Sequence, residues 1–89
     1  MRYFSLMSPF LVVAGLAAPA FAGENITLEQ LPAAVKATVQ REVKTGQILE
    51  IERDQKKGQP IFEVEFLDAG VKWEIHVAPD GKLLIRKED

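Results

Sequence analysis

The chain has 89 residues, a formal net charge of −2 at pH 7 and no cysteine. This length accommodates at most one domain, and the absence of cysteine excludes both disulfides and a lipid-modified N-terminal cysteine. The mildly acidic balance also disfavours nucleic acid and anionic membranes as partners, because phosphate binding requires a concentrated basic surface.

Residues 1–22 have the order of features of a cleavable secretory signal. Arg2 provides a positive start, a long uncharged segment follows, and the segment ends in Ala20-Phe21-Ala22, the small-x-small form that signal peptidase accepts. We therefore expect cleavage after Ala22 and a periplasmic or secreted protein that has no membrane attachment afterwards. A retained anchor is the alternative, since an uncharged run of about 20 residues is long enough to cross a bilayer.

Residues 23–30 are predicted to form a loose leader and a helix N-cap, and residues 31–89 a folded domain. Thr27 and Gln30 have the spacing of a capping box, while Pro32 fits the first turn of a helix that starts nearer Leu31. Apolar side chains then recur every four residues. This repeat predicts an amphipathic helix of about four turns that ends near Gly46 and lies on a sheet, burying Leu31, Val35, Val39 and Val43.

The rest of the chain alternates between apolar and polar residues with a period of two. This pattern predicts strands at about 47–53, 61–67, 71–77 and 82–87, which are separated by turn-forming residues. Ile48 breaks the alternation of Leu49 and Ile51, so either it belongs to the corner after the helix or the first strand contains a bulge. The predicted fold is α+β, with one N-terminal helix packed on one face of a four-stranded antiparallel meander.

Register follows from the rule that residues on the same face oppose one another. The predicted inner pairs of the second hairpin are Phe66–Val71, Val64–Trp73 and Phe62–Ile75, and its outer pairs are Glu65–Lys72 and Glu63–Glu74. A type I turn that ends in Gly81 predicts the pairs Val77–Leu83, Ile75–Ile85, Glu74–Arg86 and His76–Leu84 in the last hairpin. Trp73 is then expected in the core.

Several of these segments together resemble a PepSY-type domain: 31–35 (LPAAV), 51–52 (IE), 62–66 (FEVEF) and 74–82 (EIHVAPDGK). The similarity is greatest to the small exported PepSY-like group, which is related to the fold of the beta-lactamase inhibitor protein, and it covers about residues 31–88. The resemblance implies a non-catalytic module that binds or restrains a protein partner such as a secreted peptidase. It brings no catalytic motif, and Phe62 stands where the family commonly has an aromatic hydroxyl.

The inventory of reactive side chains argues against an enzyme. Beyond residue 22 the chain has no Ser, Tyr or Cys, and its only histidine is His76. Neither Thr27, Thr38 nor Thr45 has a base nearby in the predicted arrangement, and no glycine-rich phosphate loop occurs. We therefore expect no catalytic residue and no cofactor.

A metal site is a weaker expectation. Glu74 and His76 face the same way, and Glu63 lies opposite Glu74 in the predicted register. These residues supply three ligands, whereas a closed zinc site takes four, and Arg86 is expected to compete for Glu74. Glu63, Glu74 and His76 are therefore only weak metal candidates.

The feature of most functional interest is a predicted acidic face, formed by Glu50, Glu52, Glu63, Glu65 and Glu74. Like charges directly opposite one another destabilise a sheet, so this concentration favours a role in docking a basic protein surface or divalent cations. His76 and Leu84, which form a small apolar spot in the predicted register, complete the candidate partner-binding residues. A partner could also bind by adding a strand to the free edge of the meander. Two functions follow: a module that binds or inhibits another exported protein, or a cation-binding envelope accessory protein.

Overall fold

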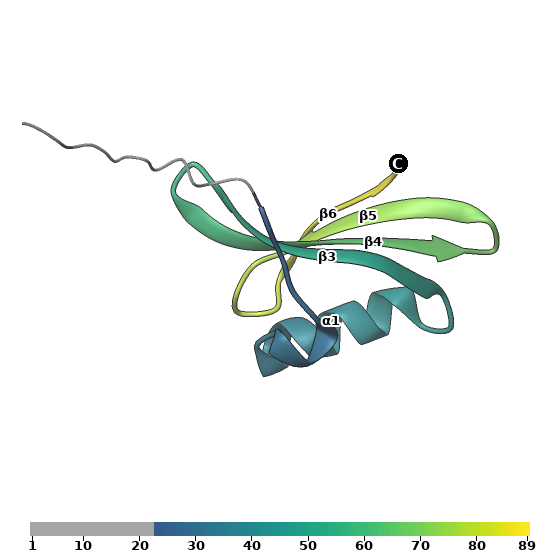
Figure 1. Ribbon diagram of the computed structural model, residues 1–89, viewed down its shortest axis with the longest axis horizontal. Helices are drawn as coiled ribbons and strands as arrows, with labels where there is room; N and C mark the ends of the chain where they lie inside the picture. The colour runs from purple at the N-terminus through teal and green to yellow at the C-terminus, as the bar shows by residue number, and fades with distance from the viewer. Residues whose placement is uncertain (1–22) are drawn as a thin grey trace, which may run out of the picture.

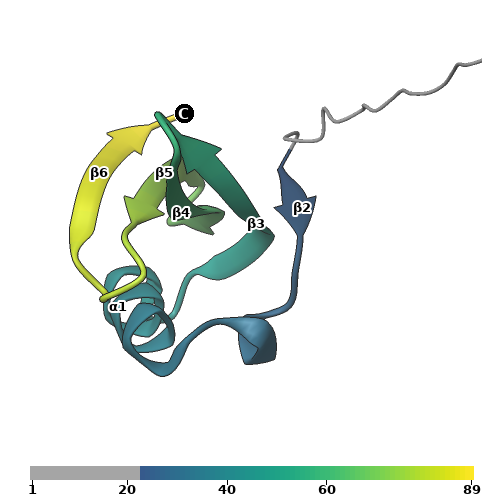
Figure 2. The ribbon, with the colours of Figure 1, turned by 90° about the vertical axis from the view of Figure 1, so that its left-hand side faces the viewer.

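The computed structural model describes residues 23–89, which form one helix and one antiparallel sheet (Figure 1). The strands lie side by side in the order β2 (Glu24–Asn25), β3 (Gln47–Lys56), β4 (Gln59–Asp68), β5 (Val71–Val77) and β6 (Leu83–Glu88). Helix α1 (Ala33–Val43) precedes β3, and the sheet curls over it (Figure 2). The α+β fold is therefore confirmed, with five strands rather than four. The signal segment 1–22 and cleavage after Ala22 lie outside the described residues.

The additional strand comes from the leader, which was expected to be loose. Glu24 lies opposite Arg53 in β3, and their side chains form an ion pair of 3.1 Å. Ile26 continues the pairing, since its N–H donates to the carbonyl of Ile51 at 2.9 Å, and its side chain joins the core. A strand of two residues is too short to show a periodicity, so this element could not be predicted from the sequence.

The helix is shorter than predicted. Gln30 accepts a hydrogen bond from the N–H of Thr27 at 2.8 Å, as in a capping box, but the box opens a short 3-10 turn, Leu28–Gln30. Pro32 then separates this turn from α1, because a proline that lacks an N–H fits only the start of a helix. At the other end Lys44 has a positive φ of 55°, which ends α1 at Val43 rather than near Gly46.

The ambiguity in the first long strand is resolved by a bulge. Ile48 lies opposite Phe66 and Glu50 opposite Glu65, so Leu49 has no partner in β4. Leu49 is 43% exposed, whereas Ile48 packs against the core and Ile51 is buried. The extra residue changes the parity of the strand, which is why both isoleucines lie inside.

The hairpin of β4 and β5 has the predicted faces but not the predicted register. Phe66 lies opposite Trp73 and Asp68 opposite Val71, two residues away from the expected pairing. The reason is the turn: Ala69 and Gly70 both have positive φ, 52° and 82°, which is the geometry of a two-residue hairpin loop. The outer pairs are consequently Glu65–Glu74 and Glu63–His76, not Glu65–Lys72 and Glu63–Glu74.

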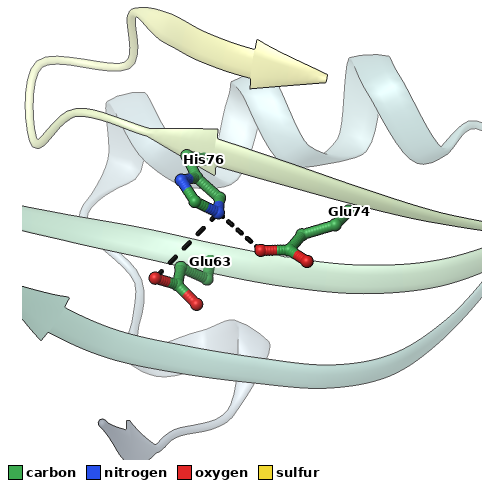
Figure 3. Close-up of side chains that lie close together, drawn as sticks. All are labelled: Glu63, Glu74 and His76. Atoms are coloured by element: carbon green, nitrogen blue, oxygen red, sulfur yellow. Dashed lines mark hydrogen bonds and ion pairs between the residues drawn. The ribbon is translucent and has the colours of Figure 1, made fainter. Parts of the chain in front are cut away.

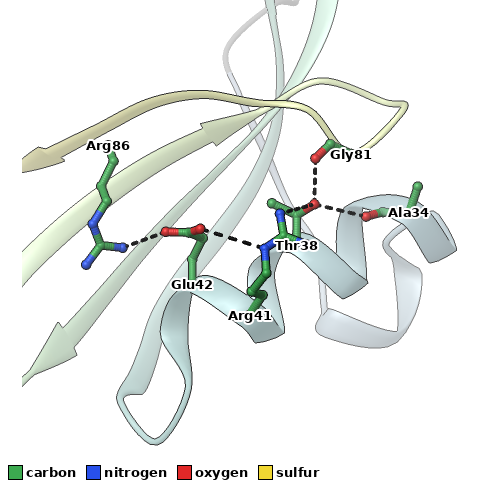
Figure 4. Close-up of polar contacts among 6 residues, drawn as sticks. All are labelled: Ala34, Thr38, Arg41, Glu42, Gly81 and Arg86. Carbon is green, nitrogen blue, oxygen red and sulfur yellow. Dashed lines mark hydrogen bonds and ion pairs between the residues drawn. The ribbon is translucent and has the colours of Figure 1, made fainter.

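A second bulge changes the last hairpin. Val77 lies opposite Leu83 as predicted, but the register then shifts, so that His76 lies opposite Ile85 and Ile75 opposite Arg86. The predicted pairs Ile75–Ile85, Glu74–Arg86 and His76–Leu84 are therefore wrong. Arg86 lies on the helix side of the sheet, with its guanidinium 4.5 Å from the ring centroid of the partly buried Trp73. It also donates to Glu42 of α1 at 2.9 Å (Figure 4).

The helix side of the sheet holds the core. Its members are mainly branched apolar side chains from α1 and the three central strands, with Phe62 and Phe66: Ile26, Leu31, Val35, Val39, Val43, Ile51, Phe62, Val64, Phe66, Ile75 and Val77. Thr38 ties the helix to the turn before β6, because its hydroxyl donates to the carbonyl of Gly81 at 2.5 Å (Figure 4). The opposite side of the sheet carries the acidic face.

Candidate functional site: the acidic sheet face

The acidic face consists of two rows of residues that cross the three central strands. In the first row Glu50, Glu65 and Glu74 lie opposite one another in β3, β4 and β5. In the second row Glu52, Glu63 and His76 do the same. The structure therefore brings together all six of these predicted side chains, and three carboxylate pairs are direct cross-strand neighbours: Glu50–Glu65, Glu65–Glu74 and Glu52–Glu63.

Lysines neutralise the face only at its margins. Lys72 Nζ lies 3.7 Å from Glu65 and 3.8 Å from Asp89, while Lys56 Nζ lies 3.7 Å from Glu63. The four glutamates of β3 and β4 surround a small hollow of about 40 Å³. Arg86, which was expected to neutralise Glu74, points to the other side of the sheet and pairs with Glu42, and Lys56 is the second cation near the face instead.

The crowding of carboxylates changes their proton affinity. Partial burial raises the pKa of Glu52 above its usual value, and a side-chain hydrogen bond with Glu50 and the charges of Glu50, Glu63 and Asp54 raise it further. Partial burial likewise raises the pKa of Glu65; Lys72 opposes this shift, and Asp89 and Glu50 add to it. Both carboxylates are thus harder to ionise in the folded protein than in the unfolded chain.

Because the pKa values of Glu52 and Glu65 are raised, we expect these two groups to make the protein less stable as the pH rises. Above the ordinary carboxyl pKa of 4.5, the native state holds protons on Glu52 and Glu65 that the unfolded chain has released. Their contribution to the free energy of unfolding is therefore complete below that pH and is lost as the pH rises through the raised pKa values. Urea unfolding from about pH 4 to pH 7 measures the effect. The double variant Glu52→Gln/Glu65→Gln should show a smaller decline, and an equal decline would contradict the assignment.

His76 is the buried member of the face. Its side chain is 8% exposed, and its Nε2 lies 2.5 Å from Glu74 Oε2 and 4.0 Å from Glu63 Oε2 (Figure 3). Glu63 and His76 are directly opposite each other, and Glu74 lies two residues from His76 on the same strand. The weak metal candidates of the sequence are therefore brought together, with ligand atoms within 4.8 Å of one another.

The apolar spot beside His76 is different from the one expected. Leu84 lies at the bulge and has no partner in β5, whereas Ile85, 42% exposed, lies opposite His76. Sequence reasoning also missed two acidic neighbours, Asp54 and Asp89, which lie close to the Glu52–Glu63 and Glu65–Glu74 pairs respectively. Asp54 continues the alternation of Glu50 and Glu52 and could have been found; Asp89 follows the last strand and gave no signal.

A second concavity lies where the leader departs from β3. It has a volume of about 490 Å³ and is lined on one side by residues 25–28 and on the other by residues 48–51. The β2 pairing involves only the middle of β3, so the backbone of β3 nearer its start borders this groove. Its walls are mainly apolar, and they include the bulged Leu49.

The threonines are the hydroxyl side chains of the described part of the chain, and two of them, Thr27 and Thr38, have structural contacts. Thr38 donates to the carbonyl of Gly81, and Thr27 lies within 3.3 Å of the side chain of Gln30. The hydrogen bonds found for these hydroxyls involve no carboxylate or imidazole base.

Comparison with known proteins finds a solved structure with a similar fold. No family model matches the chain, and no curated protein matches it significantly. A crystal structure of a protein from Bacteroides eggerthii DSM 20697, provisionally described as periplasmic, is similar, with a TM-score of 0.64 and 26% identity over 70% of this chain. The chain spans about half, 48%, of the length of that protein. Within residues 23–89, no helix is long and apolar enough to cross a membrane.

Proposed function

We propose that the protein is a non-catalytic exported binding module that docks a basic surface of another protein onto its acidic face. The observation that carries this proposal is the set of three directly opposed carboxylate pairs on the central strands. Export is supported by the signal-like residues 1–22 and by the description of the similar Bacteroides protein. The resemblance to PepSY-type domains favours a regulated or inhibited partner, such as an exported peptidase.

The opposed carboxylate pairs lower the stability of the fold. Each like-charge pair across a sheet destabilises the fold by a few tenths to about 1 kcal/mol. A surface that served only solubility would avoid this loss of stability if lysines were interspersed among the glutamates. Lysine or arginine side chains of a partner would remove this repulsion when they bind. Such an interface forms rapidly and weakens with salt, because the attraction is screened beyond about 8 Å at physiological ionic strength.

The variant Glu50→Gln/Glu52→Gln/Glu65→Gln tests the proposal. We expect it to be more stable than the wild type by roughly 0.5–2 kcal/mol, since it removes all three opposed charge pairs, and to lose its partner. Urea unfolding measures the first effect, and capture from an envelope fraction with immobilised protein, eluted by a salt gradient, measures the second.

The matched control removes the same number of charges away from the face: Glu24→Gln/Glu29→Gln/Asp68→Asn. It should retain the partner and its salt dependence. If the acidic-face variant captures the partner as well as the control does, the acidic face is not the docking surface.

A further inference from the structure

The acidic face contains a cluster that docking of a basic surface does not explain. The His76 cluster (Glu63, Glu74 and His76) unites two carboxylates and the only imidazole of the chain on two adjacent central strands. Figure 3 shows Nε2 of His76 turned toward an oxygen of each glutamate. No flexible loop contributes to the cluster, so its geometry is set by the sheet itself.

The exposure of these side chains is unusual for the wet side of a sheet. The side chains of Glu63, Glu74 and His76 are 17%, 16% and 8% exposed, compared with 31% for Glu65, which lies opposite Glu74. Among residues 23–89, the lysine or arginine in ion-pair contact with the cluster is Lys56, which is 58% exposed and reaches only Glu63. The cluster therefore offers a divalent cation two shielded carboxylates and an imidazole, with one exposed lysine beside them.

The donor set and its spacing fit a transition metal. A tetrahedral Zn²⁺ with ligand bonds of about 2.0–2.1 Å holds its ligand atoms about 3.3 Å apart. The distances from Nε2 to the two carboxylate oxygens, 2.5 Å to Glu74 and 4.0 Å to Glu63, lie on either side of this value. A lengthening of the first distance by about 0.8 Å and a shortening of the second by about 0.7 Å would bring both to the tetrahedral spacing.

The chemistry of the donors also discriminates between cations. A buried imidazole nitrogen suits Zn²⁺ and other late transition metals, whereas Ca²⁺ and Mg²⁺ prefer oxygen ligands alone. Three protein ligands leave a coordination position for water or another oxygen. Glu52, which lies opposite Glu63, is the nearest further carboxylate of the row.

We propose that Glu63, Glu74 and His76 form a binding site for a divalent transition-metal ion of the zinc class, with a position open to water or to a ligand from a partner. The site shares Glu63 and Glu74 with the proposed docking face, but Glu50, Glu52 and Glu65 are not among its ligands, so metal binding can be tested without a protein partner. Bound metal would also stabilise the fold, since a preformed set of ligands exists only in the native state.

The test uses the purified protein after removal of metals with EDTA, titrated with ZnCl₂ and separately with CaCl₂. Calorimetry should give saturable binding of one Zn²⁺ per chain and at least about tenfold weaker binding of Ca²⁺. The variants His76→Gln, Glu63→Gln and Glu74→Gln should each weaken Zn²⁺ binding at least about tenfold. The matched control Glu65→Gln, which removes a carboxylate that is not a proposed ligand, should bind Zn²⁺ within about twofold of the wild type.

NMR of the wild-type protein tests the site without relying on variants, which could fail to fold. Because His76 is the only histidine, its imidazole nitrogens give a single pair of NMR resonances in the wild-type protein. Stoichiometric Zn²⁺ should shift these resonances, and Ca²⁺ should not. Unchanged imidazole resonances, or equal losses of Zn²⁺ binding in Glu65→Gln and Glu63→Gln, would overturn the site whatever the outcome for a protein partner.

Discussion

Replacing Phe66 by alanine is expected to destabilise the protein by about 3–5 kcal/mol, enough to unfold a large fraction of it. Phe66 is fully buried at the centre of β4, opposite Ile48 in β3 and Trp73 in β5. A domain of residues 23–89, without disulfides, has a total stability of roughly 3–10 kcal/mol. The cavity left by the ring would therefore cost much of the stability that the fold possesses.

Removing the Phe66 ring also weakens the contact between the helix and the sheet. The guanidinium of Arg86 lies 5.6 Å from the ring centroid of Phe66 and also binds Glu42 of α1. Urea unfolding followed by circular dichroism measures the effect. The control is Ile85→Ala on the opposite side of the sheet, where an exposed side chain should cost less than about 1 kcal/mol. Equal effects of the two variants would contradict the assignment of the core to the helix side.

Gly81→Ala is expected to destabilise the protein by about 2–5 kcal/mol. Gly81 has a φ of +92°, and a Cβ placed there would lie 2.7 Å from the carbonyl oxygen of Ala34 in α1. The neighbouring backbone cannot yield as a flexible side chain would, so α1 and the turn would have to separate. This movement would also strain the short hydrogen bond from Thr38 to the carbonyl of Gly81.

Gly58→Ala provides the matched control for this close approach. Gly58 also has a positive φ, +77°, but a Cβ there would have no neighbour within 4 Å. It should therefore cost only the backbone strain, about 1–2 kcal/mol. Thermal or urea unfolding of both variants separates the cost of backbone strain from the cost of the close contact with Ala34. Equal losses in the two variants would show that contact between helix and turn contributes nothing.

The two proposed sites share the same sheet face and have Glu63 and Glu74 in common. Glu50 and Glu65 lie in the first row, where Lys72 is the nearby cation, whereas the His76 cluster combines Glu63 and His76 of the second row with Glu74 of the first. Glu63 lies opposite Glu52 on one side and His76 on the other, and Glu74 lies opposite Glu65. Metal binding would consequently lower the negative charge of the docking face, and Zn²⁺ should weaken the capture of a basic partner.

The alternation of residues was sufficient to place the candidate site on one face. Glu63, Glu65, Glu74 and His76 occupy alternate positions between apolar residues, and a strand with period two sends them all to the same side. Glu50 and Glu52 follow the same rule once β3 lies beside β4. The buried stripe of α1 was equally readable from its four-residue repeat.

The neighbours within that face could not be read in the same way. Register depends on the conformation of the turns and on bulges, and a shift of two residues leaves every side chain on its predicted side. The positive φ of Ala69 moved the pairing so that Glu63 lies opposite His76 rather than Glu74. The bulge near Val77 moved Arg86 from Glu74 to the rings of the core.

The sequence by itself therefore determined the class of fold, the buried stripe of the helix and the face on which each acidic residue lies, because these follow from local periodicity. Only the tertiary structure decided which acidic residues are direct neighbours, that Glu74 is held by His76 rather than by Arg86, and that the leader adds a strand to the sheet. These features depend on where strands distant in the chain meet, and small changes in turns and bulges select among registers that the periodic pattern leaves equivalent.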